Sequence, residues 1–118
     1  MADEAQEKLK IMDLMLDVFG KRWATRVFLR LLYSGRRMGF NELLRATPGI
    51  NPKMLAERLK SFESHGLVKR EVETSPIRTY YSLTDAGLDL KDSIDSMLAW
   101  NKKWTSSIYK NRQQPKQF

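Results

Sequence analysis

The 118-residue sequence has no cysteine and a single histidine, His65. Without cysteine the chain forms no disulfide, no thiolate metal site and no thiol-based redox sensor. One imidazole without cysteines or paired carboxylates nearby does not make a typical metal site. Its position beside Gly66 instead favours an interaction with the carbonyl groups at a helix end. The sequence therefore predicts neither a metal ion nor a cofactor.

Long apolar runs and catalytic motifs are also missing. No stretch reaches the roughly 18–20 apolar residues that cross a bilayer, and the acidic, amphipathic N-terminus does not resemble a secretory signal. Neither a glycine-rich phosphate loop nor a serine–histidine–aspartate set is present. Asp89, Asp92 and Asp95 have no companion base, which favours a solvated helix face. We therefore expect a cytoplasmic protein that is not an enzyme and has no membrane partner.

Positive charge is abundant and is concentrated in the middle of the chain. The formal net charge is +7 and the sequence pI is about 9.8. Residues 21–82 carry thirteen Lys or Arg and five acids, a net charge of +8, whereas residues 1–20 carry −3 and residues 83–118 carry +2. This distribution favours a nucleic acid as partner. A generally basic surface is the alternative explanation.

One segment near the middle of the chain has the pattern of a helix followed by a β-hairpin. Asn51 suits an N-cap, Pro52 suits the first helical position, and Gly66 suits the left-handed residue that ends a helix. Two strands are expected over residues 67–73 and 77–83. A helix with a basic hairpin directly after it is the layout of a winged helix-turn-helix, which reads DNA.

The remaining segments complete a mainly α fold with one small β-hairpin. Further helices are expected over residues 3–19, 23–33, 40–46 and about 84–108, the last capped by Thr84. All belong to a single domain that spans residues 1–118. Residues 109–118 are polar and are expected to form a flexible tail.

The two end helices carry more apolar surface than one small domain buries, which predicts a homodimer. The first helix has a second apolar stripe formed by Ile11, Leu14, Met15 and Val18, so it needs two partners: its own domain and another subunit. The last helix has a heptad-like seam with one polar member, Asn101; packing of this seam on its own domain is the alternative. The predicted dimerisation residues are Leu9, Met12, Leu16, Phe19, Leu90, Ile94, Met97, Asn101, Trp104 and Ile108.

Six short runs share a pattern with a known family. They are Gly20–Trp23, Phe40–Leu43, Pro48–Leu55, Arg58–Leu59, Gly66–Arg70 and Tyr81–Gly87. Together they resemble the HxlR family of winged-helix transcriptional regulators over about residues 9–105. The most specific part of this resemblance is the pair of runs Pro48–Leu55 and Tyr81–Gly87 with the separation that they have in this sequence. The resemblance implies a homodimer that binds a palindromic operator through its recognition helices. Some members of the family sense thiol-reactive compounds through a cysteine, and this chain has none.

The helix from Pro52 is the predicted recognition helix, because such a helix presents its N-terminal residues to base edges. Lys53 and Arg58 would donate to guanine, and Glu57 would accept from cytosine. Alternating strand residues mean that Lys69 and Arg70 cannot both face DNA. The predicted DNA-binding residues are Asn51, Lys53, Met54, Glu57, Arg58, Lys60, Lys69, Arg70, Arg78, Arg36, Arg37, Lys21 and Arg22.

Alternatives remain open for several of these residues and for the function. Arg58 would otherwise pair with a neighbouring acid, Glu57 would pair with Lys53 or Lys60, and Lys60 would be solvated. A small-molecule effector pocket lined by Trp23, Trp100 and Trp104 competes with ordinary packing of these rings. The leading function is sequence-specific regulation through double-stranded DNA. A nonspecific architectural DNA binder and a winged-helix protein–protein module are the competing classes.

Overall fold

The computed structural model describes residues 2–112, with side chains described for residues 3–107. The chain divides into two compact units, Met1–Leu88 and Asp89–Phe118. Among residues 2–112, no helix combines the length and the apolar character that a bilayer span requires.

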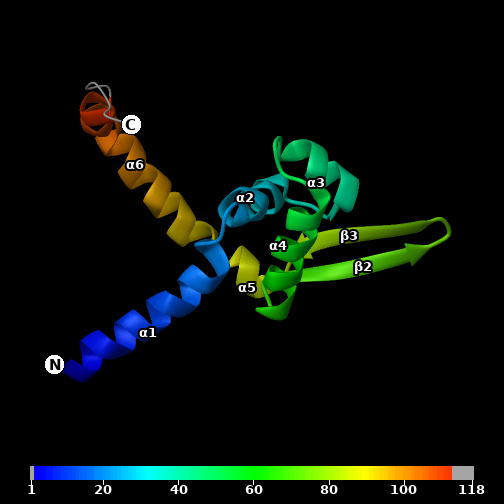
Figure 1. The fold of residues 1–118 in the computed structure, drawn as a ribbon, viewed down its shortest axis with the longest axis horizontal. Helices are drawn as coiled ribbons and strands as arrows, with labels where there is room; N and C mark the ends of the chain where they lie inside the picture. Colours follow the sequence, from blue (N-terminus) through cyan, green and yellow to red (C-terminus); the bar gives the residue numbers. More distant parts are fainter. Residues whose placement is uncertain (1, 113–118) are drawn as a thin grey trace. The chain divides into compact units, whose positions relative to one another are not determined.

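In the first unit, helices surround one end of a small antiparallel sheet (Figure 1). The helices are α1 (Ala2–Phe19), α2 (Ala24–Ser34), α3 (Phe40–Ala46), α4 (Pro52–Ser64) and α5 (Asp85–Leu88), and the strands are β1 (Met38–Gly39), β2 (Val68–Thr74) and β3 (Ile77–Leu83). The strand order is β1-β3-β2, so β3 is central. The β2–β3 hairpin, which we call the wing, extends well beyond the helices (Figure 1). This is the mainly α, winged helix-turn-helix fold class that the sequence predicts.

The core of the first unit lies between α2, α3, α4 and the base of the wing. The Phe28 ring lies 5.1 Å from Phe19 and 5.5 Å from Phe62, measured between centroids, and the rings meet edge-on. Such edge-to-face contacts add stability beyond the area that they bury. The other large side chains that are fully buried are Val27, Leu43, Leu55 and Leu59. This core covers one face of α4 and leaves the opposite face outside.

The two strands of the wing pair from Val68–Leu83 at the base to Thr74–Ile77 at the far end. Residues opposite each other in an antiparallel pair share a face of the sheet. Val68 and Leu83 are buried, so their face is turned toward the core. The opposite face begins with Lys69 and Ser82.

The boundary of α2 and the strand β1 differ from the sequence-based prediction. Helix α2 begins at Ala24 instead of Trp23, because Trp23 has a positive φ of 73° that no residue of a right-handed helix adopts. Strand β1 was not predicted at all. Its two residues pair with Tyr81 and Tyr80 of β3, and a strand of two residues is too short to show an alternating pattern.

The prediction of one continuous C-terminal helix from Thr84 is wrong, because the helix is interrupted after Leu88. Thr84 does act as a cap: its Oγ1 accepts a hydrogen bond from the Gly87 N–H at 3.2 Å. However, α5 ends at Leu88 and a turn precedes the next helix. Gly87 is a weak helix former, and its backbone packs so tightly that a Cβ there would lie 2.4 Å from the Leu67 carbonyl oxygen. These tertiary contacts hold α5 at the base of the wing.

The second unit is built on α6 (Lys91–Arg112). The side chains of Met97, Trp100 and Trp104 are exposed along it. Helix α6 continues past the expected end at residue 108. The side chain of Ile108 lies outside the described residues, and so do residues 113–118 of the predicted tail.

Most of α1 is exposed on both apolar stripes. The exposed fraction is between 41% and 65% for its large apolar residues Leu9, Ile11, Met12, Leu14, Met15 and Leu16. Among the described side chains of α1 only Val18 is buried, and Phe19 joins the core rings. The expectation that one stripe packs on its own domain therefore holds only at the end of the helix.

Candidate nucleic-acid interface

The start of α4, which carries most of the predicted base-reading residues, is defined by a cap. The Asn51 side-chain Oδ1 accepts a hydrogen bond from the Met54 backbone N–H at 2.8 Å, and Pro52 occupies the first helical position. The cap satisfies one of the free N–H groups of the first turn. Because the cap uses only the oxygen, the two amide N–H donors of Asn51 remain available to a ligand.

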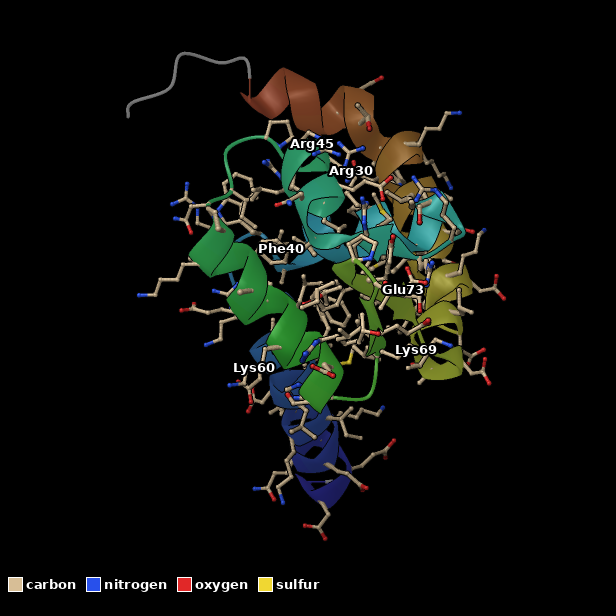
Figure 2. The ribbon with its side chains drawn as sticks, turned by 90° about the vertical axis from the view of Figure 1, so that its right-hand side faces the viewer. Arg30, Phe40, Arg45, Lys60, Lys69 and Glu73 are labelled. Atoms are coloured by element: carbon tan, nitrogen blue, oxygen red, sulfur yellow. The ribbon has the colours of Figure 1, made fainter. Side chains whose placement is uncertain are left out.

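The outer face of α4 is exposed and carries two lysines. Lys53, Ala56, Glu57 and Lys60 are all exposed, as their helical spacing predicts. None of the ion pairs among the described residues includes Lys53, Glu57 or Lys60. The alternative that Glu57 pairs with Lys53 or Lys60 within the helix is therefore not observed. Figure 2, viewed from the wing side, shows Lys60 on the outer side of α4. Two ammonium groups therefore stand on this face without a carboxylate partner in the described part of the chain.

Arg58 connects α4 to the segment before α2. Its Nε donates to the Arg22 carbonyl oxygen at 2.9 Å, and its Nη2 lies 3.0 Å from the Met54 Sδ. Within residues 3–107 no carboxylate forms an ion pair with Arg58. A bidentate contact of Arg58 with guanine would therefore require it to leave the Arg22 carbonyl.

The segment before α2 brings positive charge close to the turn between α3 and α4. The Trp23 ring packs against Gly49, where an added Cβ would lie 3.0 Å from the indole. The guanidinium groups of Arg22 and Arg26 lie 5.4 Å and 5.2 Å from the centroid of that ring. Lys21 is exposed in the same segment. The two predicted residues Lys21 and Arg22 thus lie in a turn beside the helix-turn-helix.

The wing places Lys69 and Arg70 on opposite faces, as the strand alternation predicts. Arg70 is paired in register with Tyr81, on the face turned toward the core. The pKa of the Tyr81 phenol is raised by partial burial; Arg70 lowers it and Glu63 of α4 raises it further. The Lys69 ammonium lies on the other face, 4.0 Å from Glu71. Arg70 therefore shares a face with α4, and Lys69 does not.

Arg36 is held by a carboxylate in the free protein. Its guanidinium donates to both oxygens of Glu42, and Glu42 also accepts from the Gly39 backbone N–H at 3.2 Å. The hydrogen bonds from Arg36 and then from Gly39 lower the pKa of Glu42, and the same pair raises the pKa of Arg36. The Glu42 side chain thus caps the N-terminus of α3 and also pairs with Arg36.

Arg37 is held by the wing. Its two terminal nitrogens lie 3.5 Å from Glu71 and 3.4 Å from Glu73, and its guanidinium carbon lies 3.8 Å from the centroid of the Tyr80 ring. In Figure 2, Glu73 and Lys69 mark this face of the wing. Arg36 and Arg37 are both among the predicted DNA-binding residues, and both are engaged within the fold.

Several exposed arginines are missing from the sequence-based interface. Arg26 and Arg30 follow Arg22 at intervals of four residues on α2, and Arg45 is exposed near the end of α3. Figure 2 shows Arg30 and Arg45 in its upper part. The regular spacing on α2 was the available signal. Arg78, which was predicted, is exposed on β3 and takes part in no ion pair among the described residues.

Other candidate sites have ordinary surroundings. The Nδ1 of His65 lies 2.8 Å from the Ser61 carbonyl oxygen at the end of α4, which confirms the helix-end role. Within the described part of the chain, no group of three His, Cys, Asp or Glu residues is arranged to hold a metal ion. Trp23 lies in the first unit, whereas Trp100 and Trp104 lie exposed on α6 in the second. A pocket that joins the three tryptophans stays a prediction.

A helix-turn-helix with an exposed lysine-bearing second helix and a basic wing defines the class of winged-helix DNA-binding regulators. The family model "HxlR-like helix-turn-helix" matches residues 18–109. The chain is 37% identical over 90 residues to the HTH-type transcriptional regulator YvaP of Bacillus subtilis strain 168, covering 75% of this chain and 82% of YvaP. It is similarly 36% identical over 90 residues to YodB of the same organism, covering 75% of this chain and 79% of YodB.

Solved structures agree. The reduced form of the regulator YodB has a TM-score of 0.71 and 33% identity, over 79% of this chain and 90% of that one. A MarR-family transcriptional regulator from Enterococcus faecalis V583 has a TM-score of 0.75 and 29% identity, over 87% of this chain and 93% of that one. The chain belongs to the HxlR family. It is a transcriptional regulator of the winged-helix type and not an enzyme, and its family implies DNA as its partner.

Proposed function

We propose that this regulator binds a palindromic operator in double-stranded DNA as a homodimer and recognises its sequence. The observation that carries the proposal is the outer face of α4, where Lys53 and Lys60 are exposed without a carboxylate partner among the described residues. A helix with one buried and one exposed, basic face fits the major groove of B-DNA.

The roles along α4 follow from the geometry of its first turns. Lys53 lies nearest the reading end and donates to guanine O6 or N7, with Asn51 and Met54 beside it. Glu57, one turn further, accepts from cytosine N4. Lys60 lies a further turn away and contacts a phosphate. Arg58 retains its hydrogen bond to the Arg22 carbonyl and orients α4, or exchanges it for a base.

The wing supplies contacts that depend little on sequence. Arg70 shares a face with α4, whereas Arg78 is exposed further along the wing on the other face, where it pairs in register with Glu73. Both suit a phosphate or the adjacent minor groove. Lys69, Arg36 and Arg37 reach DNA only by exchanging their carboxylate partners for phosphate. Lys21 and Arg22 reach the backbone from the opposite side of α4.

The dimer follows from the apolar surface that the two end helices leave uncovered. Leu9, Leu16 and Met12 on α1 are 65%, 54% and 55% exposed, and Met97 on α6 is 63% exposed. Exposed apolar residues in such number on monomeric surfaces mark interaction sites. Their pairing with a second copy forms an isologous interface, and a two-fold dimer reads a palindrome. Leu90, Ile94, Asn101, Trp104 and Ile108 extend the proposed surface.

The test is selection of bound sequences from a pool of random duplexes at fixed salt. We expect a palindrome whose half-sites lie about 10 bp apart or a multiple of that spacing. The control is selection by a Lys53→Ala variant, in which the preference at one base pair of each half-site should relax. Enrichment of no sequence would favour an architectural DNA binder. Failure to bind duplexes even at low salt would favour a protein–protein module and contradict the proposal.

A further inference from the structure

A concave site lies in the first unit, between α2 and the turn that joins α3 to α4. Its volume is about 580 Å³, a size that accommodates a small organic molecule. Residues of α2, β1, α3 and the turn line it, among them Arg26, Leu29 and Arg30 from α2, Met38 from β1, and Thr47 and Pro48 from the turn. The residues of α4 and of the wing take no part in this site, so it is separate from the proposed reading face.

The charge on one wall of this site is uncompensated. Arg26 and Arg30 lie one helical turn apart on α2, and both are exposed. No acidic residue of the described chain lines the site, and no ion pair in that part of the chain includes either arginine. Arg36 and Arg37 on the same unit are both paired. Two neighbouring guanidinium groups without carboxylates favour a bound anion.

Apart from the hydroxyl-bearing Tyr33 and Ser34, the rest of the site is mostly apolar, and it includes Thr47 with an unsatisfied hydroxyl. Leu29, Met38 and Pro48 supply hydrocarbon surface. Thr47 is only 2% exposed, and its Oγ1 has no hydrogen-bond partner among the described residues. A buried hydroxyl without a partner destabilises a fold. A ligand oxygen at this wall would provide the partner after a small rotation of the Thr47 side chain.

We propose that this site binds a small organic anion with an apolar body, such as an aromatic or aliphatic carboxylate. The carboxylate pairs with Arg26 and Arg30, and the hydrocarbon covers Leu29, Met38 and Pro48. An inorganic anion would leave the apolar wall in water, and a neutral hydrocarbon would leave the two charges uncovered. The site therefore requires both properties in one molecule.

The site is connected to the reading end of α4. The Arg26 guanidinium lies 5.2 Å from the Trp23 ring centroid, and that ring packs on Gly49, two residues before the Asn51 cap. An anion at Arg26 and Arg30 also removes positive charge beside the DNA. Bound carboxylate therefore lowers duplex affinity, and duplex lowers carboxylate affinity by the same factor. The coupling between carboxylate and duplex affinity rests on the proposed function, whereas the binding of the carboxylate does not.

Binding is tested by isothermal titration calorimetry on the full chain without DNA. The probes are benzoate, hexanoate and 2-naphthoate, with 2-naphthamide as the uncharged match and sulfate as the anion without an apolar body. We expect saturable binding of at least one carboxylate at millimolar concentration or below, about tenfold tighter than the amide or sulfate. Saturable binding of none of the three carboxylates, or equal binding of amide and carboxylate, overturns the proposal.

Variants locate the bound ligand. Arg30→Gln should weaken carboxylate binding about tenfold, and Thr47→Val, which keeps the shape of the side chain, should weaken it less while leaving the protein folded. Lys10→Gln on α1 is the control with the same loss of charge. Circular dichroism checks that each variant is folded. If Arg30→Gln and Lys10→Gln bind the carboxylate like the parent, the ligand lies elsewhere and the proposed site is wrong.

Coupling is tested by titrating a selected duplex with and without saturating carboxylate at constant ionic strength. We expect duplex affinity to fall about fivefold or more, and Arg30→Gln to abolish this change. Unchanged affinity with the ligand bound would overturn the coupling. Carboxylate binding by a protein that binds no duplex would instead refute the proposed function and leave the ligand site standing.

Discussion

Helix α4 carries three basic residues, and residues 36–39 together with the wing carry five, but the two regions use them differently. Lys53 and Lys60 on α4 have no carboxylate partner among the described residues, whereas Arg36, Arg37 and Lys69 each pair with a glutamate. A charge already paired must give up its partner before it neutralises a phosphate. These three cations and their partners Glu42, Glu71 and Glu73 cancel, so the net +8 of the central block is carried by its ten other Lys and Arg residues, on the segment before α2, on α2, α3 and α4, and at Arg70 and Arg78.

The strongest effect is expected from the unpaired charges of α4. Substitution of both Lys53 and Lys60 by alanine should weaken duplex binding by about 1–3 kcal/mol or more. It should also lower the slope of log K against log salt by about 1 for each phosphate that the variant no longer neutralises. Fluorescence anisotropy at several salt concentrations measures both quantities. The matched control replaces Lys10 on α1 and Lys102 on α6, which are exposed and take part in no ion pair among the described residues, by alanine. Equally weakened binding in that control would mean that only total charge matters.

The second expected effect concerns the hydrogen bond between Arg58 and the Arg22 carbonyl. Arg58→Ala should lower the free energy of unfolding by about 1 kcal/mol, because it removes a partly exposed charged donor, and duplex affinity should fall with it. Urea unfolding and anisotropy provide the two quantities. Arg58→Lys keeps the charge without the guanidinium geometry. Full duplex affinity in Arg58→Lys would show that the positive charge alone suffices. The proposal that Arg58 orients α4 through the Arg22 carbonyl would then be wrong.

A smaller effect is expected from Arg37, which holds the wing through Glu71, Glu73 and Tyr80. Arg37→Ala removes an exposed cation–π contact and two exposed ion pairs, which together contribute about 0.5–1 kcal/mol. Backbone amides of the wing should exchange with deuterium faster, and duplex affinity should fall a few-fold. Arg78→Ala is the comparison: it should weaken all duplexes evenly without faster exchange. The reverse pattern would place Arg37 on DNA and Arg78 in the fold.

The weakest effect is a pH dependence from Glu42. Because Arg36 and the Gly39 N–H lower the pKa of Glu42 in the folded state, its contribution to stability is present above the ordinary glutamate pKa. It disappears as the pH falls through the lowered value. Glu42→Gln should therefore reduce the melting temperature slightly at neutral pH and leave it unchanged in strong acid. A difference that persists undiminished in strong acid would show that the carboxylate charge is not responsible.

Helix α4 and the wing could be predicted from the sequence because their signals are local. Asn51, Pro52 and Gly66 mark the two ends of α4 within a few residues, and alternation alone places Lys69 and Arg70 on opposite faces. The ion pairs of Arg37 could not be predicted, since Glu71 and Glu73 lie more than thirty residues away and meet Arg37 only when β1 joins β3.

The same reason explains the errors at α2 and α5. The left-handed Trp23 packs on Gly49, and α5 packs on Leu67 through Gly87. Neither contact can be predicted from the spacing of apolar residues along the sequence. The apolar stripe of α1 is visible as a pattern, but the pattern does not say that nearly all of it stays exposed within one chain.

NMR gives the sharpest test of whether the outer face of α4 reads DNA. A ¹⁵N-labelled full chain is titrated with the duplex obtained by selection, and the backbone amide shifts are followed. We expect the largest shifts at residues 51–60, with a second group in the wing around Arg70 and Arg78. Large shifts confined to α1 or α6, with the amides of α4 unchanged, would show that α4 does not read DNA.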